Sequence, residues 1–160
     1  GEVMGIGDAF DEAFAKATLG AGVKLPTSGR CFLSVKESDK PYVVPVAREL
    51  LDLGFELVCT RGTRRVLAAA GIASEQVNKV TEGRPDISDE LKNRRVDFII
   101  NTTEGRQSIA DSALIRRLAL QYKVCYTTTL TGGVALCTAI RYGRGERVRR
   151  LQDLHAQQGA

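Results

Sequence analysis

The pattern of apolar and polar positions alternates between short apolar runs and segments with helical spacing. Apolar runs at 31–35, 55–58, 76–80, 96–100 and 123–126 predict five strands. The segments between them carry apolar residues three or four positions apart, which is typical of helices that bury one face. Strands that alternate with helices across short loops predict an α/β fold: a single doubly wound domain with a five-stranded parallel sheet flanked by helices, Rossmann-like in architecture.

The helical segments each predict a buried face. We expect Pro41 in the first turn of a helix that Gly54 ends, and further helices at 66–70, around Leu91, at 109–122, at 130–140 and at 146–158. The expected inward positions are Phe10, Ala13, Phe14 and Ala17 in a first helix, Val43, Val46, Ala47, Leu50 and Leu51 in the next, and Ile109, Ala113, Leu114, Leu118 and Tyr122 in the helix at 109–122.

The chain divides at a Gly- and Pro-containing stretch over 20–29, which reads as a linker. We therefore expect two parts: residues 1–29, an N-terminal helix and linker that enter from a preceding domain, and residues 30–160, the sheet domain. A length of 160 residues with 43% hydrophobic and 26% charged residues suits one globular domain. Neither an apolar run of membrane-spanning length nor a leader is present in the sequence, so we expect a cytoplasmic protein without a membrane partner.

The charge balance favours an anionic partner. Lys and Arg number 23 against 19 Asp and Glu, which gives a net charge of +4. The basic runs are not interleaved with aromatic residues, so nucleic-acid binding is not expected. The four cysteines, at positions 31, 59, 125 and 137, form no Cys-x-x-Cys pair, and His155, the single histidine, is distant from them in sequence. Three of the cysteines fall in or at the end of predicted strands, where we predict buried thiols, and we expect neither a metal site nor a redox pair.

Polar side chains gather where the predicted strands end, which is where open parallel sheets bind ligands. Hydroxyls and amides at helix N-termini, together with lysine charge, suit a phosphate monoester. The residues at these strand ends are Lys36, Lys40, Thr60, Thr63, Lys79, Asn101, Thr102, Thr103, Thr127, Thr128 and Thr129.

Each of these residues also has a purely structural interpretation. Thr60 and Thr63 could cap a helix, Lys79 could be solvated, and Asn101 could end its strand through a local backbone bond. Their joint occurrence favours an anion pocket. Gly132 and Gly133 fit either a close ligand approach or a hinge. We find neither a P-loop nor a Gly-x-Gly-x-x-Gly motif in the sequence.

Catalytic groups are scarce near the predicted pocket. Carboxylates lie on the adjoining loops and helix starts, but the sequence pairs none of them with a group that would tune a general base. We therefore predict no catalytic residue, while enolisation, hydrolysis and transfer remain open. The carboxylates are Glu37, Asp39, Glu82, Glu104 and Asp111.

Five short motifs in order give the sequence a family resemblance. They are Thr-Arg-Gly-Thr at 60–63, Asn-Lys-Val at 78–80, Glu-Gly-Arg-Pro at 82–85, Ile-Asn-Thr-Thr at 100–103 and Leu-Ala-Leu-Gln-Tyr-Lys at 118–123. With Gly-Glu-Val-Met-Gly at 1–5, they closely resemble the C-terminal allosteric domain of the bacterial carbamoyl phosphate synthetase large subunit, which has the methylglyoxal-synthase-like fold. The resemblance covers essentially the whole chain.

The resemblance implies a regulatory site for nucleotide monophosphates, with UMP as inhibitor and IMP as activator. Its matched residues are Lys40, Thr60, Thr63, Lys79, Asn101 and Thr103. It also implies an ornithine site that would use Tyr126 and Thr128, completed by the synthetase domains. The implied parent enzyme uses ATP with Mg or Mn and pairs with a small glutaminase subunit, whereas this chain itself would hold no cofactor.

Two departures from the family pattern bear on these expectations. Arg61 stands where the family often has histidine, which adds a cation near the phosphate, and Thr127 replaces a frequent aspartate, which weakens the case for ornithine. The stretch that carries the catalytic aspartate of methylglyoxal synthase reads Glu-Gly-Arg-Pro at 82–85, without that base. A stand-alone phosphate-ester lyase of the methylglyoxal synthase type is the alternative function, and a pure interaction domain is the third.

Overall fold

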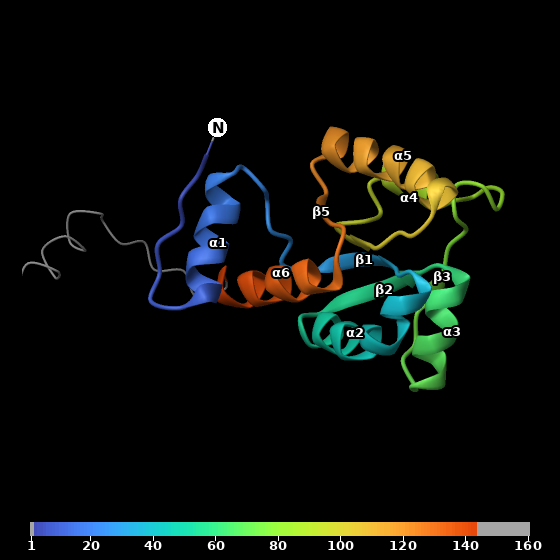
Figure 1. The fold of residues 1–160 in the computed structure, drawn as a ribbon, viewed down its shortest axis with the longest axis horizontal. Helices are drawn as coiled ribbons and strands as arrows, with labels where there is room; N and C mark the ends of the chain where they lie inside the picture. The colour runs from blue at the N-terminus through green and yellow to red at the C-terminus, as the bar shows by residue number, and fades with distance from the viewer. Residues whose placement is uncertain (1, 144–160) are drawn as a thin grey trace, which may run out of the picture.

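The computed structural model describes residues 2–143 and contains one parallel sheet with helices on both faces (Figure 1). The sheet order is β3-β2-β1-β4-β5, so the chain builds outward from β1 on one side and then returns to β1 on the other. The strands are β1 (Gly29–Ser34), β2 (Phe55–Cys59), β3 (Glu75–Gln76), β4 (Phe98–Asn101) and β5 (Cys125–Thr127). The helices are α1 (Phe10–Gly20), the 3₁₀-helix η1 (Glu37–Tyr42), α2 (Val43–Asp52), α3 (Arg61–Ala69), α4 (Ile87–Lys92), α5 (Arg106–Tyr122) and α6 (Leu130–Gly143).

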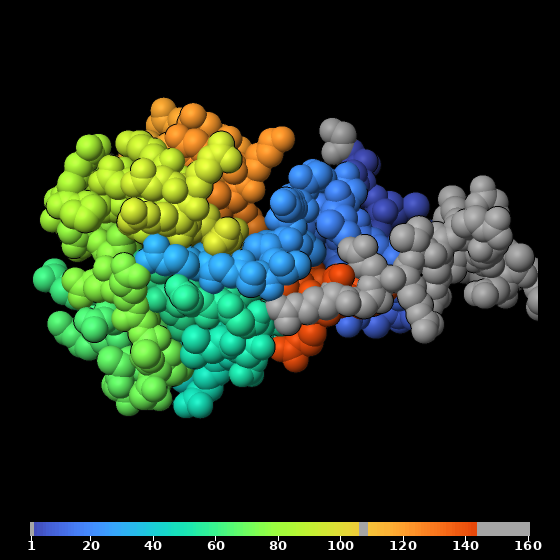
Figure 2. All heavy atoms as spheres, turned by 180° about the vertical axis from the view of Figure 1, so that it is seen from behind, coloured from blue at the N-terminus to red at the C-terminus, as the bar shows by residue number. Residues whose placement is uncertain are grey.

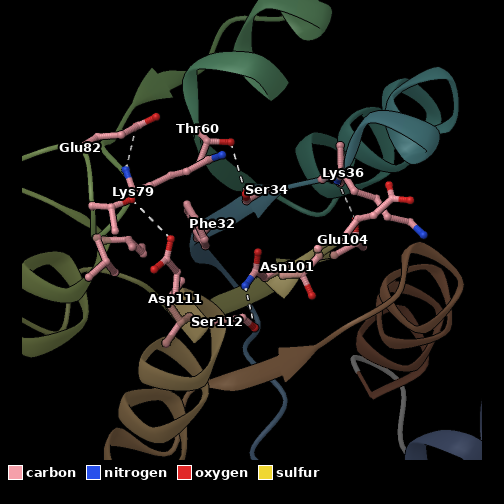
Figure 3. Close-up of a pocket in the computed structure, with 18 of the residues that line it drawn as sticks. Phe32, Ser34, Lys36, Thr60, Lys79, Glu82, Asn101, Glu104, Asp111 and Ser112 are labelled. Atoms are coloured by element: carbon pink, nitrogen blue, oxygen red, sulfur yellow. Dashed lines mark hydrogen bonds between the residues drawn. The ribbon is translucent and has the colours of Figure 1, made fainter. Parts of the chain in front are cut away.

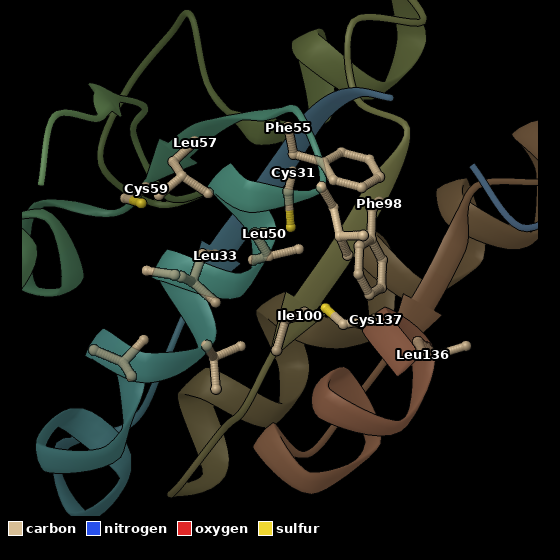
Figure 4. Packing of buried hydrophobic residues seen from close by; sticks show 14 of the residues in the cluster. Cys31, Leu33, Leu50, Phe55, Leu57, Cys59, Phe98, Ile100, Leu136 and Cys137 are labelled. Carbon is tan, nitrogen blue, oxygen red and sulfur yellow. The ribbon is translucent and has the colours of Figure 1, made fainter. Parts of the chain in front are cut away.

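The strand β1 organises both faces of the sheet because its side chains alternate between two cores. Cys31 and Leu33 belong to the core that α2, α3 and α6 cover, which Figure 4 shows in part. Phe32 points to the other core, against Leu91 of α4 and Ile115 of α5. Figure 2 shows from behind how the light-blue segment around residue 30 runs between these two layers. The predicted doubly wound α/β fold is therefore confirmed.

The pairing register places the ends of the central strands side by side. In β1 and β2, Leu33 lies opposite Cys59, and in β1 and β4, Ser34 lies opposite Asn101. All four strand pairs are parallel, so their carboxyl ends share one edge. The order reverses between β1 and β4, and a crevice opens at such a switch point in doubly wound sheets.

Several local predictions are confirmed and others are wrong. Gly54 has φ +84° and follows α2, as expected for a residue that ends a helix in the left-handed conformation. Pro41 lies within η1 rather than in the first turn of α2. The third strand is only Glu75–Gln76, because the chain leaves the sheet edge after two residues.

The predicted inward face of α2 is confirmed at Val43, Val46, Ala47 and Leu50, whereas those of α1 and α5 are only partly correct. In α5 the buried side is formed by Ser112, Ile115, Leu118 and Ala119, whereas Ile109 is 51% exposed and Ala113 is exposed too. Leu51 and Phe10 are also exposed, although Phe14 of α1 packs against the first core. These errors have one cause: periodicity gives the spacing of a helical face but not the angle at which it meets the sheet.

All four cysteines are free and buried, which confirms the prediction for the three in or near strands, where thiols act as small apolar side chains. Burial raises the pKa of Cys59 to about 11 and the pKa of Cys125 and of Cys137 to about 12. Over residues 2–143, no helix is long and apolar enough to cross a membrane. The predicted helix at 146–158, with His155, lies outside the described residues.

Candidate functional site

A cavity of about 580 Å³ lies at the carboxyl ends of the central strands, where β1 and β4 diverge. Its floor is apolar and comes from the α4 and α5 side of the sheet, through Phe32, Ile87 and Ile115. Its rim is polar and comes from the ends of, and the loops after, β1, β2, β3 and β4. Thr60, Lys79, Asn101 and Thr103 of the predicted effector residues line it.

Thr60 and Thr63 occupy the first turn of α3, but only one of them faces the cavity. Thr60 is at the N-cap position, yet its side chain does not cap the helix. Its hydroxyl instead lies 3.3 Å from Ser34 Oγ and 3.3 Å from Thr63 Oγ1. Thr63 is fully buried and accepts a 3.1 Å hydrogen bond from the Val35 backbone N–H. Thr63 therefore joins β1 to α3 behind the cavity wall.

Lys40 lies beside the start of α3 rather than in the cavity wall. A β-carbon built on Gly62 would stand 3.1 Å from Lys40 Nζ, so the ammonium lies over the first turn of the helix. Lys40 also forms an ion pair with Glu37, which does line the cavity. The first N–H groups of a helix have no acceptor within it, so Lys40 and the α3 N-terminus together favour an anion here.

Lys79 comes from the loop between β3 and α4 and reaches the same place from the opposite side. In Figure 3 its side chain extends toward Thr60. The loop is held by Glu82, whose Oε2 accepts a 3.0 Å hydrogen bond from the Lys79 backbone N–H. The other carboxylate oxygen of Glu82 lies 4.0 Å from the Arg61 guanidinium. The arrangement brings the Lys79 ammonium toward the Thr60 hydroxyl at the cavity rim.

Asn101 ends β4 and is only 4% exposed. Its amide nitrogen donates a 3.3 Å hydrogen bond to Ser112 Oγ of α5, and that oxygen lies 3.3 Å from the Tyr126 hydroxyl of β5. Figure 3 shows the amide oxygen of Asn101 pointing the other way, toward Ser34. Asn101 therefore presents an acceptor to the cavity.

Carboxylates also line the cavity, from Glu37, Glu82, Glu104 and Asp111. Asp111 lies beside the loop that carries Lys79, because Thr81 Oγ1 donates a 3.4 Å hydrogen bond to Asp111 Oδ2. The cavity thus combines ammonium and hydroxyl groups suited to phosphate with carboxylate and amide acceptors suited to hydroxyl or N–H donors. Within residues 2–143, no group of three or more His, Cys, Asp or Glu could hold a metal ion. The lining residues include neither His nor Cys.

A second cavity of about 670 Å³ adjoins the first on the η1 and α6 side of the strand ends. Lys36, Thr102 and Thr103 line both cavities, and the Lys36 backbone N–H donates a 3.0 Å hydrogen bond to Thr102 Oγ1. Thr128 lines this second cavity, whereas Tyr126 lines a third hollow beside α1. The two residues expected to share an ornithine site therefore line different hollows in this chain.

Ser34 and Ser112 line the cavity but were missed by the sequence reasoning. The position of Ser34 as the last residue of an apolar strand was a usable signal, whereas Ser112 carries none without knowledge of the inward face of α5. Gly132 and Gly133 lie inside α6, and added β-carbons would meet Thr127 Oγ1 at 2.3 Å and Ile100 Cδ1 at 2.7 Å. Packing against the protein therefore accounts for both glycines.

Comparison with known proteins agrees with the sequence resemblance. A family model described as MGS-like domain matches residues 42–128. The chain is 62% identical over 156 residues to the carbamoyl phosphate synthase large chain of Pseudomonas aeruginosa, and this match covers 98% of the chain and 14% of that protein. The corresponding protein of Halomonas eurihalina is 57% identical over 159 residues, with 98% of the chain and 15% of that protein covered. The chain thus spans about one seventh of the length of these relatives.

Proposed function

The chain belongs to the MGS-like domain family, and on that premise we propose that it is the allosteric effector-binding domain of a carbamoyl phosphate synthase large subunit. Its ligands are nucleoside monophosphates, with UMP as inhibitor and IMP as activator. In this proposal residues 1–29 lead in from the preceding synthetase domain and residues 30–160 form the regulatory domain. The parent enzyme, with its ATP sites and small glutaminase subunit, supplies carbamoyl phosphate to pyrimidine and arginine synthesis.

The observation that carries the proposal is the polar lining of the cavity of about 580 Å³ at the strand ends. Thr60, Lys79 and the α3 N-terminus, which Lys40 overlies, suit a phosphate dianion. Asn101 and Asp111 offer acceptors for ribose or base donors. A nucleoside monophosphate carries both a dianion and O–H and N–H donors, so it matches both sets of groups.

Regulation follows from differential affinity between conformations of the parent enzyme. An effector that binds one conformation more tightly shifts the equilibrium toward it, and such coupling is typically about 1–3 kcal/mol. The effector domain needs no catalytic group for this purpose. Turnover of dihydroxyacetone phosphate by the chain would instead support the lyase alternative.

A thermal-shift titration with UMP and IMP tests the proposal, with uridine as the phosphate-free control. A ligand at about a hundred times its Kd stabilises a domain by about 2.7 kcal/mol, which raises Tm by several degrees. We expect a shift with UMP or IMP and none with uridine. Lys79→Gln should reduce the shift, and Lys92→Gln, on the exposed end of α4, should not. Equal shifts with uridine and UMP would contradict a phosphate site.

Ornithine is a second candidate effector of this domain, in the proposal that Tyr126 and Thr128 contribute to its site. Because the two residues line different hollows, the remainder of such a site would have to come from the preceding synthetase domains. Thr127 offers a hydroxyl where a carboxylate would pair with an ammonium group. We therefore expect ornithine to produce no thermal shift in this chain, and a shift of several degrees would show that the chain alone forms the site.

A further inference from the structure

The Tyr126 hydroxyl is the last member of a hydrogen-bond series that begins at Asn101, in the proposed effector cavity. Ser112 Oγ lies 3.3 Å from the Tyr126 hydroxyl and accepts a 3.3 Å hydrogen bond from Asn101 Nδ2. Asn101 and Ser112 are each 4% exposed, and the ring of Tyr126 packs against the core between the sheet and α5. The three side chains come from β4, α5 and β5, so the hydrogen-bond series connects three elements.

This arrangement decides which side of the Asn101 amide meets a ligand. An amide offers donors on one side and an acceptor on the other, and its neighbours determine the orientation. Ser112 Oγ accepts a hydrogen bond from the amide nitrogen, so the amide oxygen faces the cavity, as Figure 3 shows. A serine side chain can rotate, and the Tyr126 hydroxyl gives Ser112 Oγ a second hydrogen-bond partner besides Asn101. Without Tyr126, Ser112 can turn and the amide loses its fixed partner.

We propose that Tyr126 is a positioning residue that, through Ser112, orients the Asn101 amide oxygen to read an O–H or N–H donor on the nucleoside part of the ligand. The inference rests on the proposed effector function and refines it. A phosphate dianion carries no donor, so the Asn101 oxygen discriminates between a nucleotide and phosphate alone. Tyr126 thereby acts on specificity without lining the cavity.

Calorimetric titration of the 160-residue chain with UMP and with inorganic phosphate tests this role. We expect Tyr126→Phe to raise the Kd for UMP by about 3- to 10-fold, the range for one lost hydrogen bond, and to leave the Kd for phosphate unchanged. Ser112→Ala should have the same effect. The double variant should raise the Kd for UMP no further than either single variant, because all three variants break the same series of hydrogen bonds.

Tyr122→Phe is the matched control, because its ring packs against the same core and the hydroxyl that lies beside Ser112 Oγ belongs to Tyr126. It should change neither Kd. An equal loss of UMP and phosphate affinity in Tyr126→Phe would reduce Tyr126 to a structural role and overturn the proposal. Unchanged UMP affinity in both Tyr126→Phe and Ser112→Ala would overturn it while leaving the effector function intact. Failure of the unaltered chain to bind UMP would instead overturn the effector function, and the positioning role with it.

Discussion

The two ends of β1 both hold polar side chains, but they hold them differently. At its start, Arg30 forms ion pairs with Glu90 at 2.7 Å and with Glu75, and its N–H donates to Asp97 at 2.9 Å. At its other end, Ser34 meets Thr60 at 3.3 Å, longer than the usual O–H···O hydrogen bond. The polar groups at the start of β1 are thus fully paired within the protein, whereas Ser34 at its end keeps hydrogen-bonding capacity for a ligand.

The charged group at the start of β1 is likewise stabilised by its protein partners. Burial opposes the charge of Arg30, but its hydrogen bonds to Glu90 and Glu75 outweigh this effect, so the pKa of Arg30 is raised. Through Glu75 and Glu90, Arg30 links β3 to α4, the two elements that flank the loop carrying Lys79. These ion pairs therefore help to fix the position of that loop. The comparison indicates that folding stability resides at the start of β1 and ligand affinity at its end.

The largest expected effect comes from Arg30→Met. It removes both ion pairs and leaves the largely buried Glu90 carboxylate without its closest partner, so the free energy of unfolding should fall by about 2 kcal/mol. Urea unfolding measures this loss. Arg48→Met, on the exposed side of α2, should stay within about 0.5 kcal/mol of the unaltered chain. A stability loss no larger than that of the Arg48 control would remove the contrast between the two ends.

A smaller loss is expected from Thr63→Val. The Val35 N–H would lose its acceptor in a fully buried place, which costs about 1–2 kcal/mol of unfolding free energy. Thr63→Ser keeps the hydroxyl and should recover most of that loss in urea unfolding. Because Thr63 does not line the cavity, UMP affinity in Thr63→Ser should equal that of the unaltered chain, and a loss there would assign Thr63 a direct contact with the ligand.

Ser34→Ala should separate folding from binding. Its oxygen meets Thr60 only at 3.3 Å, so the free energy of unfolding should change by less than about 0.5 kcal/mol. Its place in the cavity wall should nonetheless weaken UMP binding about threefold in a calorimetric titration. If the free energy of unfolding fell as far as in Thr63→Val, the polar groups at the end of β1 would be as fully paired within the protein as those at its start.

The smallest effect is expected from Glu12→Gln in α1, an ion pair remote from both ends of β1. The hydrogen bond from Lys16 lowers the pKa of Glu12 from 4.5 to about 2, so the carboxylate stabilises the fold above pH 4.5 and loses this effect as pH falls toward 2. Glu12→Gln should therefore lower Tm slightly at pH 7, and the difference should vanish near pH 2. Glu2→Gln, at an exposed position, is the control, and a difference that grows as pH falls would contradict the assignment.

Much of the fold could be predicted because its strands are unusually apolar. Residues 31–35 and 96–100 become the buried strands β1 and β4, each flanked by helices on both faces. The third strand could not be placed correctly, since Asn78 bridges to Asp86 outside the strand and its side chain donates to the Gly83 carbonyl at 3.2 Å. These partners lie within the loop, and an apolar run does not reveal them.

The site was predictable as a location and less so as a set of contacts. Parallel topology alone brings Thr60, Lys79 and Asn101 to one edge, and the structure places all three around one cavity. Sequence could not show that Thr63 turns inward or that Lys40 forms an ion pair with Glu37 and does not line the cavity itself. Both depend on side-chain direction within the first turn of a helix, which follows from packing.

Lys36, Thr102 and Thr103 line both strand-end cavities. A molecule in one cavity that displaces any of these residues therefore changes the wall of the other cavity. It would alter the affinity of the second cavity for its own occupant, and thermodynamic reciprocity makes the two changes in affinity equal. Residues that two cavities share thus make the two occupancies interdependent.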